Sequence, residues 1–288
     1  MTSESCAFVY VATGTAYLGE ALRSATTLRA LHPQHAIWLV TDHPPSDPGP
    51  FTAIHRPAGP VEHGPIDKLL AFEIPAERIV FLDTDTHVLG DLRPIFELLD
   101  RFDFALVQDV NRGWNYTLDG LAPAFTEFNT GVVAFRKSAA MATFFSDWRA
   151  NFVRLRPTLE AQGQPSAADQ PAFRYTLYRS ALRVAPLPNE YHFLCDYPNS
   201  TMWQVRLLHG RSDYRRVAAQ INAAPGLRSY VPDLGVPPSF AGRLRLLRGL
   251  IRFNLRALAV LLRGGENVVE NHPRKWWLDP RPPPPPAP

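Results

Sequence analysis

Residues 79–89, which read IVFLDTDTHVL, decide the fold that we predict for this chain. Four apolar residues predict a buried strand, and two aspartates one residue apart follow it at once. Because side chains alternate along a strand, we expect Asp83 and Asp85 to point to the same side, with Cα atoms about 7 Å apart. Two unpartnered carboxylates repel each other, and a bound cation removes that repulsion. The stretch therefore predicts a cation site or, in the simpler interpretation, a turn in which Asp and Thr are favoured residues.

Further apolar runs and helical spacings alternate along the chain on both sides of this strand. Strand–helix alternation is typical of an α/β domain with a mostly parallel sheet sandwiched by helices, in which ligands bind beyond the carboxyl ends of the strands. A proline cluster at 223–241 predicts a linker, which gives a main domain over 1–240 and a tail over 241–288. The predicted strands are 7–12, 36–40, 79–82, 104–107 and 130–135, the predicted helices 17–31, 67–72, 92–99 and 139–154, and a proline-rich loop is expected at 44–65.

Composition and charge narrow the class of protein. The chain has 288 residues, 45% hydrophobic and 20% charged, which is ordinary for a globular protein. Two cysteines, no basic and apolar leader and no long uncharged apolar run lead us to expect a cytoplasmic protein without a transmembrane span. Segment 241–288 has eight Arg and one Lys against three acidic residues, a formal charge of +6, which leaves −3 for residues 1–240 of a chain whose total is +3. A nucleic-acid-binding surface on the main domain is therefore not expected.

The stretch FLDTDTHVLGDL at 81–92 resembles the D-x-D motif of nucleotide-sugar glycosyltransferases of the GT-A fold, and most closely glycosyltransferase family eight, the glycogenin and galactosyltransferase-like group. Five further stretches resemble motifs of that family in the family's order. They are AFVYVATGTAYLGEAL at 7–22, PIDKLL at 65–70, EFNTGVVAF at 127–135, ADQPAF at 168–173 and LLHGRSDY at 207–214. The resemblance implies a GT-A catalytic domain over 1–240.

The family resemblance also implies a role for individual residues. It predicts Mn²⁺, or Mg²⁺, on Asp83, Asp85 and His209. It places the sugar of the donor near Asp169, Gln170 and Asn129. Tyr17 is expected to stack on uracil, and Gly131 to let the ligand approach the backbone. The full set expected to bind the donor is Thr13, Tyr17, Lys68, Asp83, Thr84, Asp85, Gly131 and Arg211.

The late histidine segment departs from the family pattern. The family usually has H-x-x-G-x-x-K-P-W, whereas this chain has His209-Gly210-Arg211, so the phosphate-binding lysine is absent. Arg211 or Arg215 is expected to replace it, which keeps the charge and changes the geometry.

Four of the site residues also have a structural interpretation that the sequence leaves open. Tyr17 is alternatively a core aromatic, and Lys68 a solvated lysine on a helix. His209 is alternatively a histidine at the end of a strand, and Asp169 a helix N-cap ahead of Pro171.

The predicted activity is transfer of a hexose from a UDP-sugar to a glycan, a lipid-linked molecule or another hydroxyl acceptor, with retention of configuration implied by the family. One alternative is a nucleotidyltransferase that makes a nucleotide sugar, but Gly14-Thr15-Ala16 is poor for its glycine-rich loop. Another is a non-catalytic, membrane-associated scaffold.

The tail, residues 241–288, contains a regular pattern of arginines and apolar residues. Five arginines between 245 and 263 fall within an arc of about 80° on a helical wheel, and apolar residues, most of them leucines, occupy most of the rest. Residues 241–263 contain no acidic residue. This pattern predicts a basic amphipathic helix that lies on an anionic membrane, at the inner face, or packs on the main domain or a second copy of the chain.

Overall fold

The structure is a computed structural model of the 288-residue chain. It describes residues 5–109, 116–211, 213–223 and 226–232, together with 248, 251, 252 and 255. The chain divides into two units, 1–235 and 236–288, and all elements discussed below belong to the first. The predicted helix over 241–263 lies almost wholly outside the described residues, so it and the boundary at 240 stay predictions. None of the helices in the described part of the chain has the length and apolar character to cross a bilayer.

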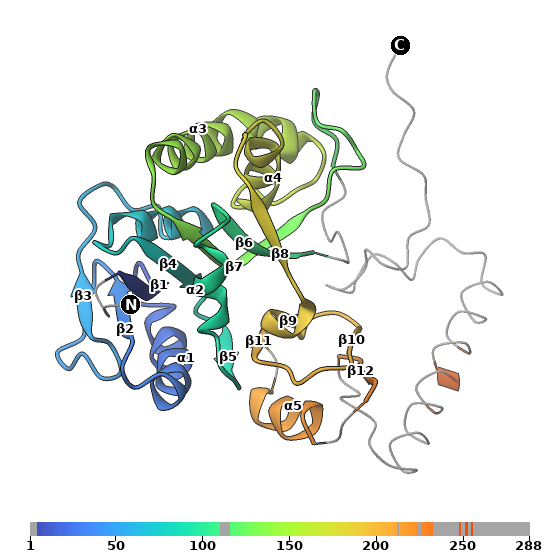
Figure 1. Ribbon diagram of the computed structural model, residues 1–288. Helices are drawn as coiled ribbons and strands as arrows, with labels where there is room; N and C mark the ends of the chain where they lie inside the picture. The colour runs from blue at the N-terminus through green and yellow to red at the C-terminus, as the bar shows by residue number, and fades with distance from the viewer. Residues whose placement is uncertain are drawn as a thin grey trace. The chain divides into compact units, whose positions relative to one another are not determined.

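A seven-stranded sheet forms the centre of the first unit (Figure 1). Four neighbouring strands, β3, β2, β1 and β4, run parallel, β7 runs antiparallel to both β4 and β6, and β8 is parallel to β6. The prediction of a mostly parallel sheet is confirmed. In sheet order the strands are β3 Ala53–His55, β2 Ala36–Val40, β1 Cys6–Val11, β4 Arg78–Leu82, β7 Phe128–Arg136, β6 Phe104–Gln108 and β8 Val184–Leu187.

Helices cover both faces of this sheet, and Figure 1 shows α1 on the side opposite α3 and α4. Alternation along the strands divides the core into two: in β4, Val80 packs with Tyr10 and Leu28, whereas Phe81 packs with the cluster that contains Phe144. Burial of large apolar side chains on both faces stabilises the sandwich. The helices are α1 Leu18–Leu31, η1 Pro65–Glu73 (a 3₁₀ helix), α2 Pro94–Leu98, α3 Ala139–Ala161, α4 Gln170–Tyr178, η2 Asn189–Tyr191 (3₁₀) and α5 Tyr214–Ile221.

Two small sheets lie beside the main one. In the first, β11 Leu207–His209 pairs antiparallel with β5 Thr86–Val88 and parallel with β9 Phe193–Leu194. In the second, β10 Asn199–Thr201 pairs with β12 Arg228–Tyr230. The first of these matters for function, because the register opposes His209 to Thr86, just after the aspartate pair.

Some predicted elements differ from the structure. The strand ends at Leu82, and Asp83, Thr84 and Asp85 form a turn that leads into β5, so strand alternation is not what brings the carboxylates together. The turn is fixed at both ends: the Asp83 N–H donates to the Gly131 carbonyl (2.8 Å) and the Gly210 N–H to the Asp85 carbonyl (3.1 Å). The predicted loop at 44–65 contains β3, and the helix predicted over 139–154 continues to residue 161.

Candidate metal and donor site

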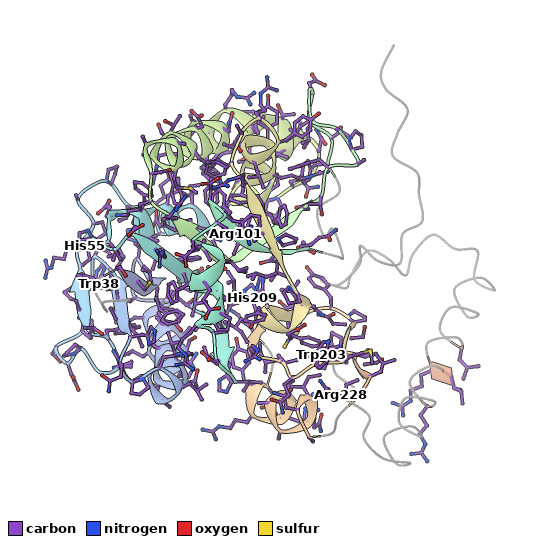
Figure 2. All side chains as sticks on the ribbon, viewed as in Figure 1. Trp38, His55, Arg101, Trp203, His209 and Arg228 are labelled. Carbon is purple, nitrogen blue, oxygen red and sulfur yellow. The ribbon has the colours of Figure 1, made fainter. Side chains whose placement is uncertain are left out.

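Asp83, Asp85 and His209 lie together beyond the end of β4. Their ligand atoms all lie within 4.8 Å of one another. His209 Nε2 is 3.2 Å from Asp85 Oδ1 and 3.8 Å from Asp83 Oδ2. Figure 2 labels His209, the last residue of β11 in the first small sheet. Two carboxylates and one imidazole are a donor set that suits Mn²⁺, and so the residues present fit the expected cation.

Gly131 makes room for the His209 ring, a role that the sequence did not predict. A Cβ atom on this residue of β7 would lie 2.3 Å from His209 Cε1. No side chain fits at that distance, so the ring of His209 lies against the backbone at Gly131. The glycine is thus required by the position of the His209 ring.

Lys68 is buried behind the aspartates. Its Nζ lies 3.2 Å from Asp169 Oδ2 and 3.7 Å from Asp83 Oδ2, and it donates to the carbonyl (3.1 Å) and hydroxyl (3.0 Å) of Thr130. The solvated-helix interpretation is therefore wrong. Asp169 precedes α4, but its side chain forms no capping bond and accepts from the Thr130 hydroxyl at 2.9 Å. Asp169 is thus the N-cap residue of α4 by position, as the alternative interpretation expected, but its carboxylate contacts Thr130 and Lys68 instead of capping the helix.

A pocket of about 190 Å³ borders this cluster. Seven of the eight residues expected to bind the donor line it, and Gly131 is the exception. Tyr17 is 37% exposed at its rim, which excludes the core interpretation of this aromatic. Thr13 is fixed there by donating to Asp67 Oδ2 at 2.6 Å. The lining comprises Val11, Thr13, Tyr17, Gly64, Pro65, Asp67, Lys68, Phe81, Asp83, Thr84, Asp85 and Arg211.

Arg211 closes one side of the pocket. Its guanidinium lies 3.3 Å from Asp85 Oδ2, donates to Glu20 at 3.0 and 3.2 Å, and lies 5.8 Å from the centre of the Tyr17 ring. Glu20 also accepts from the Thr84 hydroxyl at 3.0 Å, which links α1 to the aspartate turn. Glu20 was not predicted from the sequence, although its place in the first turn of α1 was a usable signal.

Gln170 and Asn129 lie in a neighbouring polar network and do not line this pocket. The Gln170 amide donates to Asp109 Oδ2 (3.1 Å) and Glu127 Oε1 (2.8 Å), and the Asn129 amide donates to the same Asp109 oxygen (3.3 Å). Asp109 directly follows β6, so its position at a strand end could have identified it from the sequence. This network holds both amides in fixed orientations.

The charges of the site perturb its pKa values. Burial lowers the pKa of His209, but the hydrogen bond and charge of Asp85 outweigh it, and the net change is upward. Burial also acts against the charged form of Lys68, yet Asp169 and Asp83 raise its pKa, so it remains a cation. For Asp85, burial is outweighed by the bond from His209, which holds its pKa well below the usual range. Opposite charges thus stabilise one another in a buried setting.

Solved structures of similar fold show the fold class of this chain. The chain is similar to the galactosyltransferase LgtC in complex with donor and acceptor sugar analogs, with a TM-score of 0.51 and 14% identity over 72% of this chain and 87% of that chain. It is also similar to the glycosyltransferase GlyE of Streptococcus pneumoniae TIGR4, with a TM-score of 0.52 and 16% identity over 72% and 55% of the two chains. At these identities the likeness shows the fold, which is GT-A.

The sequence gives the family. The model of Glycosyl transferase family 8 matches residues 68–212, half of the chain, and this span includes all three candidate metal ligands. No curated protein matches the sequence. The chain belongs to glycosyl transferase family 8, and it is a glycosyltransferase. The nucleotidyltransferase alternative is therefore not retained.

Proposed function

We propose that this enzyme transfers a hexose from a UDP-sugar to a hydroxyl acceptor, with a divalent cation held by Asp83, Asp85 and His209. The observation that carries the proposal is the convergence of these three side chains within 4.8 Å. They converge at the rim of the pocket that is lined by the residues expected to bind the donor. Mn²⁺ suits this mixed oxygen and nitrogen donor set somewhat better than Mg²⁺.

Leaving of UDP builds negative charge on the diphosphate, and the cation would supply electrostatic stabilisation of that charge when bound. Lys68 is held as a permanent cation beside Asp83 and adds to the positive potential. Arg211 is the candidate for the missing family lysine, since a guanidinium binds phosphate with two parallel hydrogen bonds. Tyr17, exposed at the rim, offers a flat face to the uracil.

On the sugar side we propose Asp169, Gln170 and Asn129, and a reaction with retention of configuration. The network around Asp109 supports this assignment, because amides whose hydrogen bonds are fixed in advance orient a substrate at low entropic cost. The Asp169 carboxylate, which is paired with Lys68 at 3.2 Å, would favour a sugar ring that gains positive charge.

The acceptor is proposed to be a glycan or a lipid-linked molecule. This part rests on the sequence of 241–263, whose arginine face would lie on an anionic membrane at its inner surface or against a second copy of the chain. A position at a membrane would bring the pocket near a lipid-linked acceptor.

A donor screen tests the proposal. UDP release is measured across several sugar nucleotides with Mn²⁺, Mg²⁺ or a chelator, for the wild type and for Asp83→Ala and Asp85→Ala. We expect turnover with at least one UDP-sugar that requires the cation and that both substitutions abolish. Asp147→Ala, an exposed position on α3, is the matched control and should be fully active. Cation-independent turnover, or full activity in both site variants, would contradict the metal site; no turnover with any donor would favour the non-catalytic scaffold.

A further inference from the structure

His192 lies directly behind His209 in the interior of the first unit. Its Nε2 atom is 2.6 Å from His209 Nδ1, and the two rings stack with centres 4.7 Å apart and planes 25° from parallel. The side chain is fully buried, at 0% exposure. Neither the strand pattern nor the motifs of the sequence pointed to this residue.

Strand pairing fixes the two imidazoles relative to each other. His192 ends η2 and directly precedes β9, and β9 pairs parallel with β11, which opposes Phe193 to Leu208 and Leu194 to His209. The His209 ring also lies against the backbone at Gly131. His209 is therefore in contact with both a strand of the large sheet and a second imidazole.

The hydrogen bond between the rings constrains where the protons lie. A neutral imidazole that binds a cation through Nε2 carries its proton on Nδ1. That Nδ1–H then needs an acceptor, which in metal sites is usually a carboxylate, a carbonyl or water. Here the atom within reach is His192 Nε2, so His192 must be neutral with its own proton on Nδ1.

This arrangement leaves a polar atom buried without compensation. His192 Nδ1 has no hydrogen-bond partner among the described residues. Burying such a group is unfavourable, and a phenylalanine of similar size would fill the same space without it. Natural proteins keep costly local features chiefly where they serve a site, so packing alone does not account for a histidine here.

We propose that His192 is a positioning residue: it accepts the Nδ1 proton of His209 and so holds that ring with Nε2 turned toward Asp83 and Asp85. The inference rests on the proposed metal site and deepens it. Loss of an outer-shell partner of a metal-bound histidine typically weakens metal binding by about 10–100-fold. The ring of His192 keeps His209 ready for the cation, and it does not itself contact the substrate.

The first test compares His192→Phe with His192→Gln. Phe keeps a flat ring and removes the acceptor, whereas the Gln carbonyl oxygen can accept in its place. Mn²⁺ affinity in the presence of UDP is measured from the electron paramagnetic resonance signal of free Mn²⁺, with thermal unfolding as a check on folding. We expect about 10–100-fold weaker Mn²⁺ binding for Phe and substantial recovery for Gln. The matched control is His32→Phe, another buried histidine, which should leave Mn²⁺ affinity unchanged.

The outcomes separate this inference from the proposed function. If His209→Ala weakens Mn²⁺ binding and His192→Phe does not, the role of His192 is overturned while the metal site stands. If the wild type itself binds no Mn²⁺, both fail.

A second test uses the wild type alone, so it does not depend on whether a His192 variant folds. Nitrogen-15 spectra of the protein loaded with Mg²⁺ and UDP should show the His209 proton on Nδ1, and a proton on Nε2 would overturn the inference.

Discussion

Replacing Gly131 by alanine should disable the metal site through a single steric contact. The added methyl group would lie 2.3 Å from His209 Cε1, 2.8 Å from Nδ1 and 3.0 Å from Nε2, whereas ordinary contact begins at 3.4 Å. The ring must therefore withdraw by about 1 Å, since packed interiors leave no spare volume behind it. The strand itself cannot yield easily, because β7 is hydrogen-bonded to β4 on one side and β6 on the other. His192, which is stacked on the same ring, further limits the space into which the ring can move.

The size of the effect follows from how strictly cations hold their ligands. Metal–ligand distances vary by only about 0.2 Å, so a shift of about 1 Å removes His209 from the coordination sphere. We expect Mn²⁺ affinity to fall by at least 10–100-fold, the range that even outer-shell changes produce. Forcing one methyl group into a packed site should also lower the free energy of unfolding by about 1–3 kcal/mol.

The assay is a Mn²⁺ titration of UDP release, combined with urea unfolding. Gly59→Ala is the matched control, because a Cβ there would meet nothing within 4 Å, and it should change neither quantity. In a His209→Ala background the methyl group has space, so the unfolding penalty of Gly131→Ala should nearly vanish. Unchanged Mn²⁺ affinity in Gly131→Ala, or the same unfolding penalty with and without the His209 ring, would refute the reasoning.

Three further predictions concern charge, pH and the tail. Lys68→Met removes the positive charge from its buried pair with Asp169 and should lower the free energy of unfolding by about 3–5 kcal/mol. Lys68→Arg keeps the charge, so it should lower the free energy of unfolding much less. Equal losses of the two variants in urea unfolding would contradict the ion pair. Burial lowers the pKa of His32 despite the nearby Asp91 carboxylate. The unfolded chain therefore binds the proton first, and this contribution to stability is lost as the pH falls from about 6.5 toward the folded pKa. His32→Gln should reduce the difference between unfolding free energies measured at pH 7.5 and pH 5.5, and an unchanged difference would exclude His32 as its source. Deleting 241–288 should leave UDP binding intact and abolish sedimentation with anionic vesicles. If the truncated protein still sedimented with vesicles, the tail would not be the membrane-binding segment. If it did not fold, the tail would be part of the core.

Much of the main sheet could be predicted from sequence because its strands are buried on both faces. Runs such as Ile79 to Leu82 are continuous and apolar, and their lengths match a strand between two helix layers. The first small sheet could not be predicted in this way, since its strands β5, β9 and β11 have only two or three residues each. Such short segments carry no periodicity, and their pairing depends on contacts far apart in the chain.

The site residues, too, could be predicted only where a local motif marks them. Asp83, Asp85 and His209 were found because a motif order connects them, although their convergence comes from a turn and from β5–β11 pairing and not from strand alternation. Gly131 was singled out, but its contact with the His209 ring was not predicted, because a sequence shows that a side chain is absent and not what fills the space. His192 carried no local signal at all, since its significance depends on a partner in another strand.

Two basic side chains, Lys68 and Arg211, already lie against the aspartates of the cluster. Lys68 lies 3.7 Å from Asp83, and Arg211 lies 3.3 Å from Asp85, so each carboxylate of the pair already has a positive partner. A divalent cation on these oxygens would displace those contacts and leave two positive groups beside it. The diphosphate of the donor supplies the negative charge that both groups then need. Because the side chain of Arg211 is 60% exposed while that of Lys68 is 6% exposed, we expect Arg211 to turn from Asp85 to the phosphate and Lys68 to stay in place. Cation and donor would therefore bind with positive cooperativity, since each provides the partners that the other removes.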